Sequence, residues 1–200
     1  MAHEPSPTLT PNLELHERRY EFERLTAGFS QLVVGVTQEQ WQWRPAPDAW
    51  SLGHVIDHLN HVHELMLAPM SEAVRQGHAD EIQRPGPFRY NLIERGVIWS
   101  MGPNAPIRQQ APELFRPAEQ VPAQDEALTR FTDLQFRLVR LTEEANGLDL
   151  TRIKVTSPVS PPKIRISLGA WFQALVAHQE NHLSQAQAVV AASGYPPAID

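Results

Sequence analysis

Hydrophobic residues recur at spacings of three, four and seven positions in four separate segments of the chain. The first segment carries the pattern Leu15, Phe22, Leu25, Phe29, Leu32 and Val36. This spacing places the side chains along one stripe of an α-helix, whereas a half-buried strand would alternate at every second position. We therefore expect helices over approximately residues 12–37, 51–77, 122–148 and 167–194.

Residues with capping or breaking properties mark the expected ends of these helices. Ser51 and Ser167 stand where the second and fourth helices open, and serine is a good N-cap. The third helix is expected to end near Gly147 and the fourth at Gly194, because glycine is common just past a helix C-terminus. Within the second helix, Pro69 lacks a backbone N–H, so we expect a kink or an early stop there.

Four amphipathic helices without a convincing strand predict an all-α protein with a four-helix bundle. The proline-rich insertion of residues 78–121 forms a long crossover between helices two and three, which permits these helices to run parallel. Within it, residues 90–101 could form a short helix that covers one end of the bundle. Residues 153–166 are expected to be an extended linker. All 200 residues fit a single domain.

Composition excludes several classes of function. The net charge of −6 is spread along the chain without a basic stripe, so we expect no binding to nucleic acid. No apolar run approaches the ~20 residues of a membrane span, and the polar N-terminus lacks an apolar leader segment, so the expected location is cytoplasmic. The absence of cysteine excludes disulfides, thiolate ligands and a cysteine nucleophile.

Histidine spacing gives the main indication of chemistry. His178 and His182 are four residues apart, so on a helix their side chains differ by only about 40° in azimuth. His58, on the second helix, is the third candidate ligand, and His54 and His61 flank it at helical spacing and could replace it in another register. Inward-facing imidazoles need partners. A metal ion or a buried hydrogen-bond network would supply them.

The neighbours of the histidine pair refine this picture. Glu180 lies about 180° from the midpoint of His178 and His182, so it should face solvent or a partner and not act as the glutamate of an HExxH protease. Gln185 returns to the inward stripe, where it could hydrogen-bond a ligand imidazole or a substrate, or be an ordinary interface residue. Trp171 shares the stripe and is expected mainly to pack in the core.

Other polar and aromatic residues near the motifs have simpler expectations. Trp50 stands at the entrance of the second helix and could line a pocket, although packing is the commoner role. Asp57 is about 100° from His58 and is expected to pair with solvent or an arginine. His63 has no partner at useful spacing and is expected to be solvated.

Two motifs together resemble a known family. They are the run from Trp43 to Leu59, which contains Trp50-Ser51 and His58-Leu59, and the run His178-Gln-Glu-Asn-His182-Leu-Ser-Gln185. Their order and spacing resemble the DinB/YfiT-like family of four-helix-bundle metalloenzymes. The resemblance implies a long crossover between helices two and three, frequent homodimers and metal ligands at His58, His178 and His182. It also implies transferases or isomerases that use a low-molecular-weight thiol such as bacillithiol, mycothiol or glutathione.

Three imidazoles leave a coordination position for water or substrate, as in catalytic metal sites. Zn²⁺ and Ni²⁺ suit nitrogen ligands best. Two hypotheses follow: an enzyme that acts on a small-molecule substrate with a thiol held at the metal, or a non-catalytic metal-binding stress or interaction protein.

Overall fold

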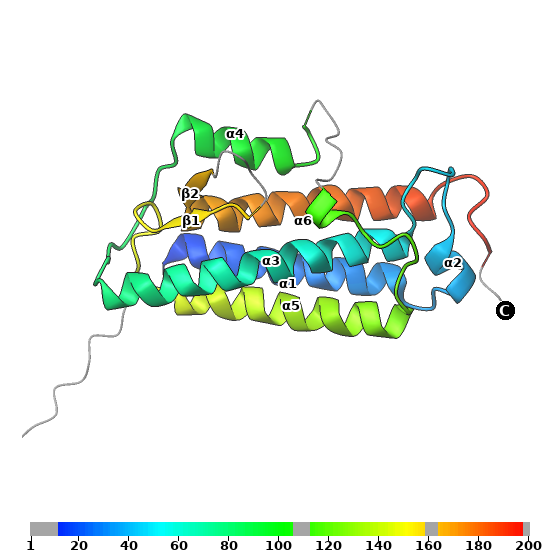
Figure 1. The fold of residues 1–200 in the computed structure, drawn as a ribbon, viewed down its shortest axis with the longest axis horizontal. Coiled ribbons are helices and arrows are strands. Elements are labelled where there is room, and N and C mark those ends of the chain that lie inside the picture. Colours follow the sequence, from blue (N-terminus) through cyan, green and yellow to red (C-terminus); the bar gives the residue numbers. More distant parts are fainter. Residues whose placement is uncertain (1–11, 106–112, 159–163, 198–200) are drawn as a thin grey trace, which may run out of the picture.

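Four long helices lie side by side in the computed structural model, which describes residues 12–105, 113–158 and 164–197 (Figure 1). They are α1 (Leu13–Val33), α3 (Leu52–Ala79), α5 (Gln124–Glu144) and α6 (Leu168–Val190). The shorter elements are α2 (Gln38–Gln42), α4 (Leu92–Met101), the 3₁₀ turn η1 (Glu113–Phe115) and the strands β1 (Lys154–Thr156) and β2 (Arg165–Ser167). The prediction of an all-α four-helix bundle is confirmed.

The long crossover allows α3 and α5 to run parallel. Asn60 of α3 donates a hydrogen bond to the carbonyl of Ala127, and one turn later Glu64 forms an ion pair with Arg130 of α5. Residue numbers therefore rise together along both helices. The helices α1 and α6 are parallel as well, and their contacts include Glu14–Gln173 and Arg24–Glu180. Two parallel pairs of helices thus form one bundle.

Helix α3 begins where the sequence predicts and continues further than expected. Ser51 is its N-cap, and the hydroxyl oxygen of Ser51 accepts a hydrogen bond from the backbone N–H of His54. Pro69 lies inside the helix, which runs on to Ala79, so of the two expected outcomes, a kink or an early stop, the early stop is wrong. Met66 and Met70 on either side of the proline are almost fully buried. Their packing offsets the hydrogen bond that proline cannot make.

Helix boundaries differ from the prediction at two other places. Helix α1 ends at Val33, and Thr37 then caps the short helix α2, which lies between the first two expected helices, where no helix was predicted. Helix α6 ends at Val190 with Ala191 as its C-cap, whereas Gly194 adopts a φ of 89° in the turn that follows. Gly194 therefore adopts the left-handed backbone conformation that glycine allows, but it is not the residue at which the helix ends.

The segment before α6 contains two short strands that pair with each other. Strands β1 and β2 are antiparallel, with Val155 opposite Ile166, and both of these side chains are buried. The expected extended linker is therefore a small β-hairpin, although residues 159–163 of the segment lie outside the described part of the chain. Each strand has three residues, which is too short to show a clear alternation in sequence.

Helix α4 confirms the short helix expected within the crossover, but it flanks α6 and does not cover an end of the bundle (Figure 1). A Cβ atom at Gly169 of α6 would lie 2.0 Å from Oη of Tyr90, so the glycine is needed for this close approach. Glu94 of α4 accepts hydrogen bonds from the backbone N–H of Ser167 and from Nζ of Lys154. These contacts fix α4 to the start of α6.

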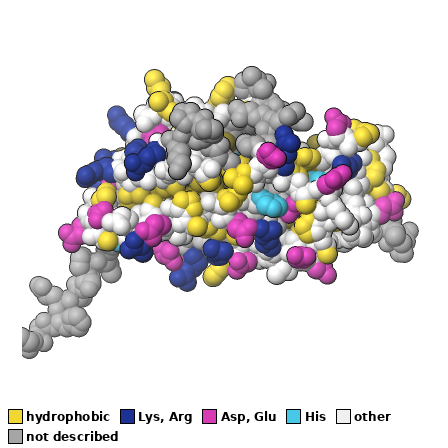
Figure 2. Space-filling view, viewed as in Figure 1, with side chains coloured by type: hydrophobic (Ala, Val, Ile, Leu, Met, Phe, Trp, Pro, Cys, Tyr) yellow, Lys and Arg dark blue, Asp and Glu magenta, His cyan; other side chains and the backbone are white. Residues whose placement is uncertain are grey.

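The face shown in Figure 2 carries positive and negative side chains intermixed around a band of hydrophobic ones. None of the helices in the described ranges is long and apolar enough to span a bilayer.

Candidate metal centre

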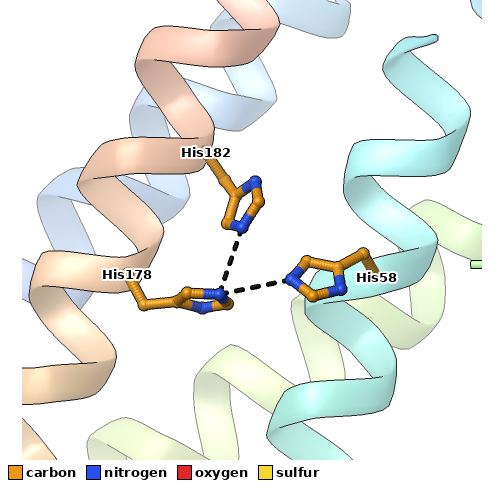
Figure 3. A group of neighbouring side chains, drawn as sticks. All are labelled: His58, His178 and His182. Atoms are coloured by element: carbon orange, nitrogen blue, oxygen red, sulfur yellow. Dashed lines mark hydrogen bonds between the residues drawn. The ribbon is translucent and has the colours of Figure 1, made fainter. Parts of the chain in front are cut away.

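Three histidines from two helices converge on one point (Figure 3). His58 comes from α3, and His178 and His182 come from successive turns of α6. The Nε2 atom of His178 lies 3.2 Å from Nε2 of His58 and 3.1 Å from Nε2 of His182. One nitrogen from each ring can be chosen so that all three lie within 4.8 Å of one another. The four-residue spacing of His178 and His182 therefore places both side chains on the same side of α6, where they form a compact cluster with His58.

Hydrogen bonds outside the cluster determine the tautomers of two rings. Nδ1 of His58 lies 2.6 Å from the backbone carbonyl of Phe115, and Nδ1 of His182 lies 2.8 Å from Oε1 of Gln185. Both partners are oxygen acceptors, so both Nδ1 atoms must carry the proton. The Nε2 atoms of these rings then direct lone pairs into the cluster. Such outer partners are typical of metal-binding histidines.

All three imidazoles are held in the neutral form. Burial lowers the pKa of His58 to about 4 and that of His182 to about 3, and it lowers the pKa of His178 well below its usual value. Neighbouring imidazoles lower the pKa of each ring further. Neutral imidazole is the form that binds a metal ion, so the site requires no deprotonation near pH 7.

The distances within the cluster fit a divalent cation. With Zn–N bonds of roughly 2.0–2.1 Å, two ligands at neighbouring corners of a tetrahedron are separated by about 3.3–3.4 Å. The observed separations of 3.2 and 3.1 Å are close to this value. The pairs His178–His58 and His178–His182 therefore already have a separation close to that of two zinc ligands, and all three ligand atoms lie within 4.8 Å of one another.

Trp50 lies against the histidine cluster. Its ring is stacked on that of His182, with centroids 5.8 Å apart and an interplanar angle of 15°, and its centroid lies 4.9 Å from that of His58. The indole is half-buried, so one part of it faces solvent beside the site. Trp50 also packs against the buried hydrophobic core, so the expected packing role is confirmed, and pocket lining stays a prediction.

The last part of the crossover is fastened to α3 beside the cluster. Asp57 is buried, and its Oδ2 accepts a hydrogen bond of 2.9 Å from the backbone N–H of Ala118. The expectation that Asp57 pairs with solvent or an arginine is therefore wrong. Together with the contact between His58 and Phe115, this bond ties two successive residues of α3 to the same short segment.

His54 and His61 do not join the cluster. Nε2 of His54 accepts a hydrogen bond from Arg44, with a separation of 2.7 Å, and Nδ1 of His54 lies 2.7 Å from the Ser51 hydroxyl. His61 is half-exposed and bonds to the backbone carbonyl of Asp57. His54 thus links the start of α3 to the preceding loop, and neither residue is placed as a ligand.

Residues beside the motif on α6 behave largely as expected. Glu180 forms an ion pair of 2.6 Å with Arg24 on the outside of the bundle. Trp171 is buried in the core and donates a hydrogen bond to the carbonyl of Val155. Within residues 12–105, 113–158 and 164–197, no carboxylate belongs to the histidine cluster. The arrangement is therefore unlike that of an HExxH protease.

The expected position of His63 is wrong as well. It was expected to be solvated, yet it is completely buried and its ring lies 6.3 Å from that of Phe131 on α5. A signal was available, because Leu59, His63, Met66 and Met70 follow the spacing four, three, four that marks a buried stripe.

The fold and the site together define a four-helix bundle with a three-histidine, metal-compatible centre between two of its helices. A family model described as the DinB superfamily matches residues 21–186, and the chain belongs to this superfamily. None of the curated proteins matches it. A similar solved structure is YfiT from Bacillus subtilis, described as a probable metal-dependent hydrolase with an unusual four-helix bundle topology. It shares 15% sequence identity and a TM-score of 0.56, over 94% of this chain and 92% of that chain.

Proposed function

We propose that the protein is a metal-dependent enzyme that uses a low-molecular-weight thiol as the nucleophile in a transfer or isomerisation reaction on a small electrophilic substrate. The observation that carries the proposal is the convergence of three neutral imidazoles, with the Nε2 atom of His178 3.2 and 3.1 Å from those of its neighbours. Zn²⁺ and Ni²⁺ are the ions proposed for these ligands.

The neutral ligand set determines the chemistry that such an ion would supply. A divalent cation held by His58, His178 and His182 would keep its full positive charge, and it would lower the pKa of a thiol or a water molecule bound beside it. No carboxylate among the described residues of the cluster offsets this charge. The site therefore favours an anionic nucleophile.

A thiol suits this site better than water does. Its ordinary pKa is about 8.5, whereas that of water is about 15.7. Deprotonation of a thiol at neutral pH thus requires a smaller shift of the pKa than deprotonation of water does. The chain itself contains no cysteine, so the thiol must come from a second molecule.

The surrounding residues have defined roles in this proposal. Phe115, through its carbonyl, and Gln185, through its side chain, hold the rings of His58 and His182 in one tautomer and orientation. Trp50 stacks on the cluster and is half-exposed, so it offers an apolar wall to a substrate that enters from its side. We therefore propose that Trp50 contacts the electrophilic substrate or the carbon skeleton of the thiol.

Hydrolysis is the second candidate. It is favoured by the similarity of the fold to YfiT, which is described as a probable metal-dependent hydrolase. A three-histidine site can also activate water without a carboxylate base, as carbonic anhydrase does. A homodimer and a non-catalytic metal-binding role remain predictions from the sequence.

A paired experiment separates these candidates. Protein loaded with Zn²⁺ or Ni²⁺ is titrated with glutathione, bacillithiol and mycothiol by calorimetry, and its turnover is measured with each thiol plus an activated haloarene and, separately, with activated esters. The proposal predicts thiol binding that requires the metal and thiol-dependent consumption of the haloarene. Ester hydrolysis without thiol binding would favour the hydrolase, and metal binding without either activity would favour the non-catalytic role.

His178→Ala is the informative variant, and His78→Ala is its matched control. His78 lies on α3, where it is exposed and forms a hydrogen bond with the backbone carbonyl of Glu144, away from the cluster. We expect His178→Ala to lose thiol binding and His78→Ala to retain it.

A further inference from the structure

His178 differs from the other two histidines of the cluster. Phe115 and Gln185 accept hydrogen bonds from Nδ1 of His58 and His182, but Nδ1 of His178 is buried and has no hydrogen-bond partner in the described part of the chain. In Figure 3 this nitrogen faces away from the other two rings. A buried imidazole nitrogen of this kind requires a partner from the bundle interior.

The proton on His178 must change position when a metal binds. His58 and His182 present unprotonated Nε2 atoms, so in the metal-free protein the hydrogen in the contacts of 3.2 and 3.1 Å comes from Nε2–H of His178. Its Nδ1 is then an acceptor. Coordination through Nε2 requires the opposite tautomer, in which Nδ1 carries the proton and donates. The group that faces Nδ1 must therefore donate in one state and accept in the other.

The core beside the cluster contains an inner polar layer, which we define as Asn60, His63, Gln135 and Gln179. All four side chains are at most 1% exposed. Nε2 of Gln135 on α5 donates a hydrogen bond of 2.7 Å to Oε1 of Gln179 on α6. Since Gln179 directly follows His178, this bond fixes the turn of α6 that carries the candidate ligand.

Several atoms of the inner polar layer have no hydrogen-bond partner among the described residues. They are Oδ1 of Asn60, both ring nitrogens of His63, Oε1 of Gln135 and Nε2 of Gln179. An apolar core would be more stable than a layer with unpaired polar atoms, so the layer opposes stability unless its atoms pair with one another, with His178 or with internal water.

His63 is the one imidazole of this layer, and it can exchange the donor and acceptor roles of its two nitrogens by a change of tautomer, without a change in the position of the ring. Burial lowers its pKa to about 3, so the ring is neutral, with one N–H and one bare nitrogen. His63 lies five residues after His58 on α3, and both of its ring nitrogens, like Nδ1 of His178, are buried without a hydrogen-bond partner among the described residues. A charge on His63 also lowers the pKa of His178. The side chain therefore combines the required chemistry with a suitable position.

We propose that His63 is a positioning residue of the metal centre. Through one internal water molecule, its ring donates to Nδ1 of His178 in the metal-free protein and accepts from Nδ1–H once a metal is bound. Gln135 and Gln179 hold the neighbouring turn of α6 in place. The inference rests on the metal binding proposed above and adds a residue that touches neither the ion nor the substrate.

The test compares the wild type with His63→Leu, His63→Gln and the control Thr142→Val. Thr142 is also buried, but its hydroxyl donates to the carbonyl of Val139 within its own helix. Zn²⁺ affinity is measured by competition with a chromophoric chelator, Co²⁺ spectra report the geometry, and imidazole ¹⁵N shifts of the metal-free protein report the tautomer of His178. Thermal unfolding of each metal-free variant reports stability.

We expect His63→Leu to bind Zn²⁺ about 10- to 100-fold more weakly, as for other residues that orient metal-bound histidines. Its metal-free form should be at least as stable as the wild type, and the ¹⁵N shifts of His178 should change. His63→Gln, which keeps a donor and an acceptor, should recover part of the affinity, and Thr142→Val should match the wild type.

Wild-type affinity in His63→Leu, with unchanged ¹⁵N shifts of His178, would overturn the inference while leaving the metal centre intact. Equal losses of affinity in all three variants, accompanied by lower thermal stability, would also overturn it, because general disruption of the core would then be the cause. A wild type that binds neither Zn²⁺ nor Co²⁺ would instead overturn the metal centre and this inference with it.

Discussion

The backbone carbonyl of Phe115 lies 2.6 Å from Nδ1 of His58, so the end of the long crossover sets the tautomer of a candidate metal ligand on α3. The adjacent residue Asp57 holds the same segment through the N–H of Ala118. The crossover is therefore part of the site as well as the connection that makes α3 and α5 parallel.

Removal of the Asp57 carboxylate should loosen this attachment. Asp57→Ala removes the acceptor of the hydrogen bond from the N–H of Ala118, and a hydrogen bond typically contributes about 0.5–1.5 kcal/mol. Ala118 is exposed, so its N–H can bond to water in the variant. We expect a lower free energy of unfolding and a metal affinity several-fold weaker, because His58 loses a fixed partner. Chemical denaturation and metal titration check this, with the exposed Asp133→Ala as control. Unchanged metal affinity in Asp57→Ala would show that the crossover does not influence the site.

Gln185 should influence metal binding without being a ligand. Its Oε1 accepts the hydrogen bond from Nδ1 of His182 at 2.8 Å. Loss of such a partner typically weakens metal binding about 10- to 100-fold. Gln185→Ala should show a loss of this order in a competition titration, while Gln187→Ala, on the exposed side of the same helix, should not. Equal affinities of the two variants would assign Gln185 to ordinary packing.

The stability of the metal-free protein should fall steeply as the pH decreases. Burial lowers the pKa of His58 to about 4, that of His63 and His182 to about 3, and that of His178 well below its usual value. In the unfolded chain an imidazole has a pKa of about 6.5, so the unfolded state takes up these protons first. The free energy of unfolding should therefore decrease from about pH 6.5 down to about pH 4, where His58 begins to titrate in the folded protein.

One variant makes this dependence quantitative. Each histidine that is protonated only in the unfolded state contributes about 1.4 kcal/mol per pH unit to the slope. His63→Leu should therefore flatten the slope between pH 6 and pH 4.5 by about this amount, while the buried but non-titrating Thr142→Val should leave it unchanged. Urea denaturation at several pH values gives the slopes. A slope in His63→Leu as steep as in the wild type would mean that His63 is solvated.

The spacing of residues in the sequence was sufficient for the bundle and for the pair His178 and His182, whereas it left His54 and His61 open as replacements for His58, which the family resemblance selected. Side chains at positions 58, 178 and 182 face inward because the helices have a regular period, and that period can be counted along the chain. The outer partners could not be found in this way. Phe115 contributes a backbone carbonyl, and Ala118 contributes a backbone N–H to Asp57. Every residue type can supply such a carbonyl, so these contacts cannot be recognised from the residue type.

The errors have related physical causes. His63 lies on the same buried stripe as Met66, so its position on the helix determines its burial although the side chain is polar. The hairpin of β1 and β2 is stabilised by pairing between segments that are too short to show a period. Pro69 is tolerated within α3 because tertiary packing outweighs local preference.

The most direct test of the central claim is X-ray absorption spectroscopy of protein that has been reconstituted with Zn²⁺ and purified without an affinity-metal column. The account predicts one ion per chain, with three imidazole nitrogens at roughly 2.0–2.1 Å and a further ligand that exchanges when a thiol is added. In His178→Ala the signal of one imidazole, or the ion itself, should disappear. A spectrum without imidazole ligands, or full occupancy with unchanged coordination in that variant, would contradict the account.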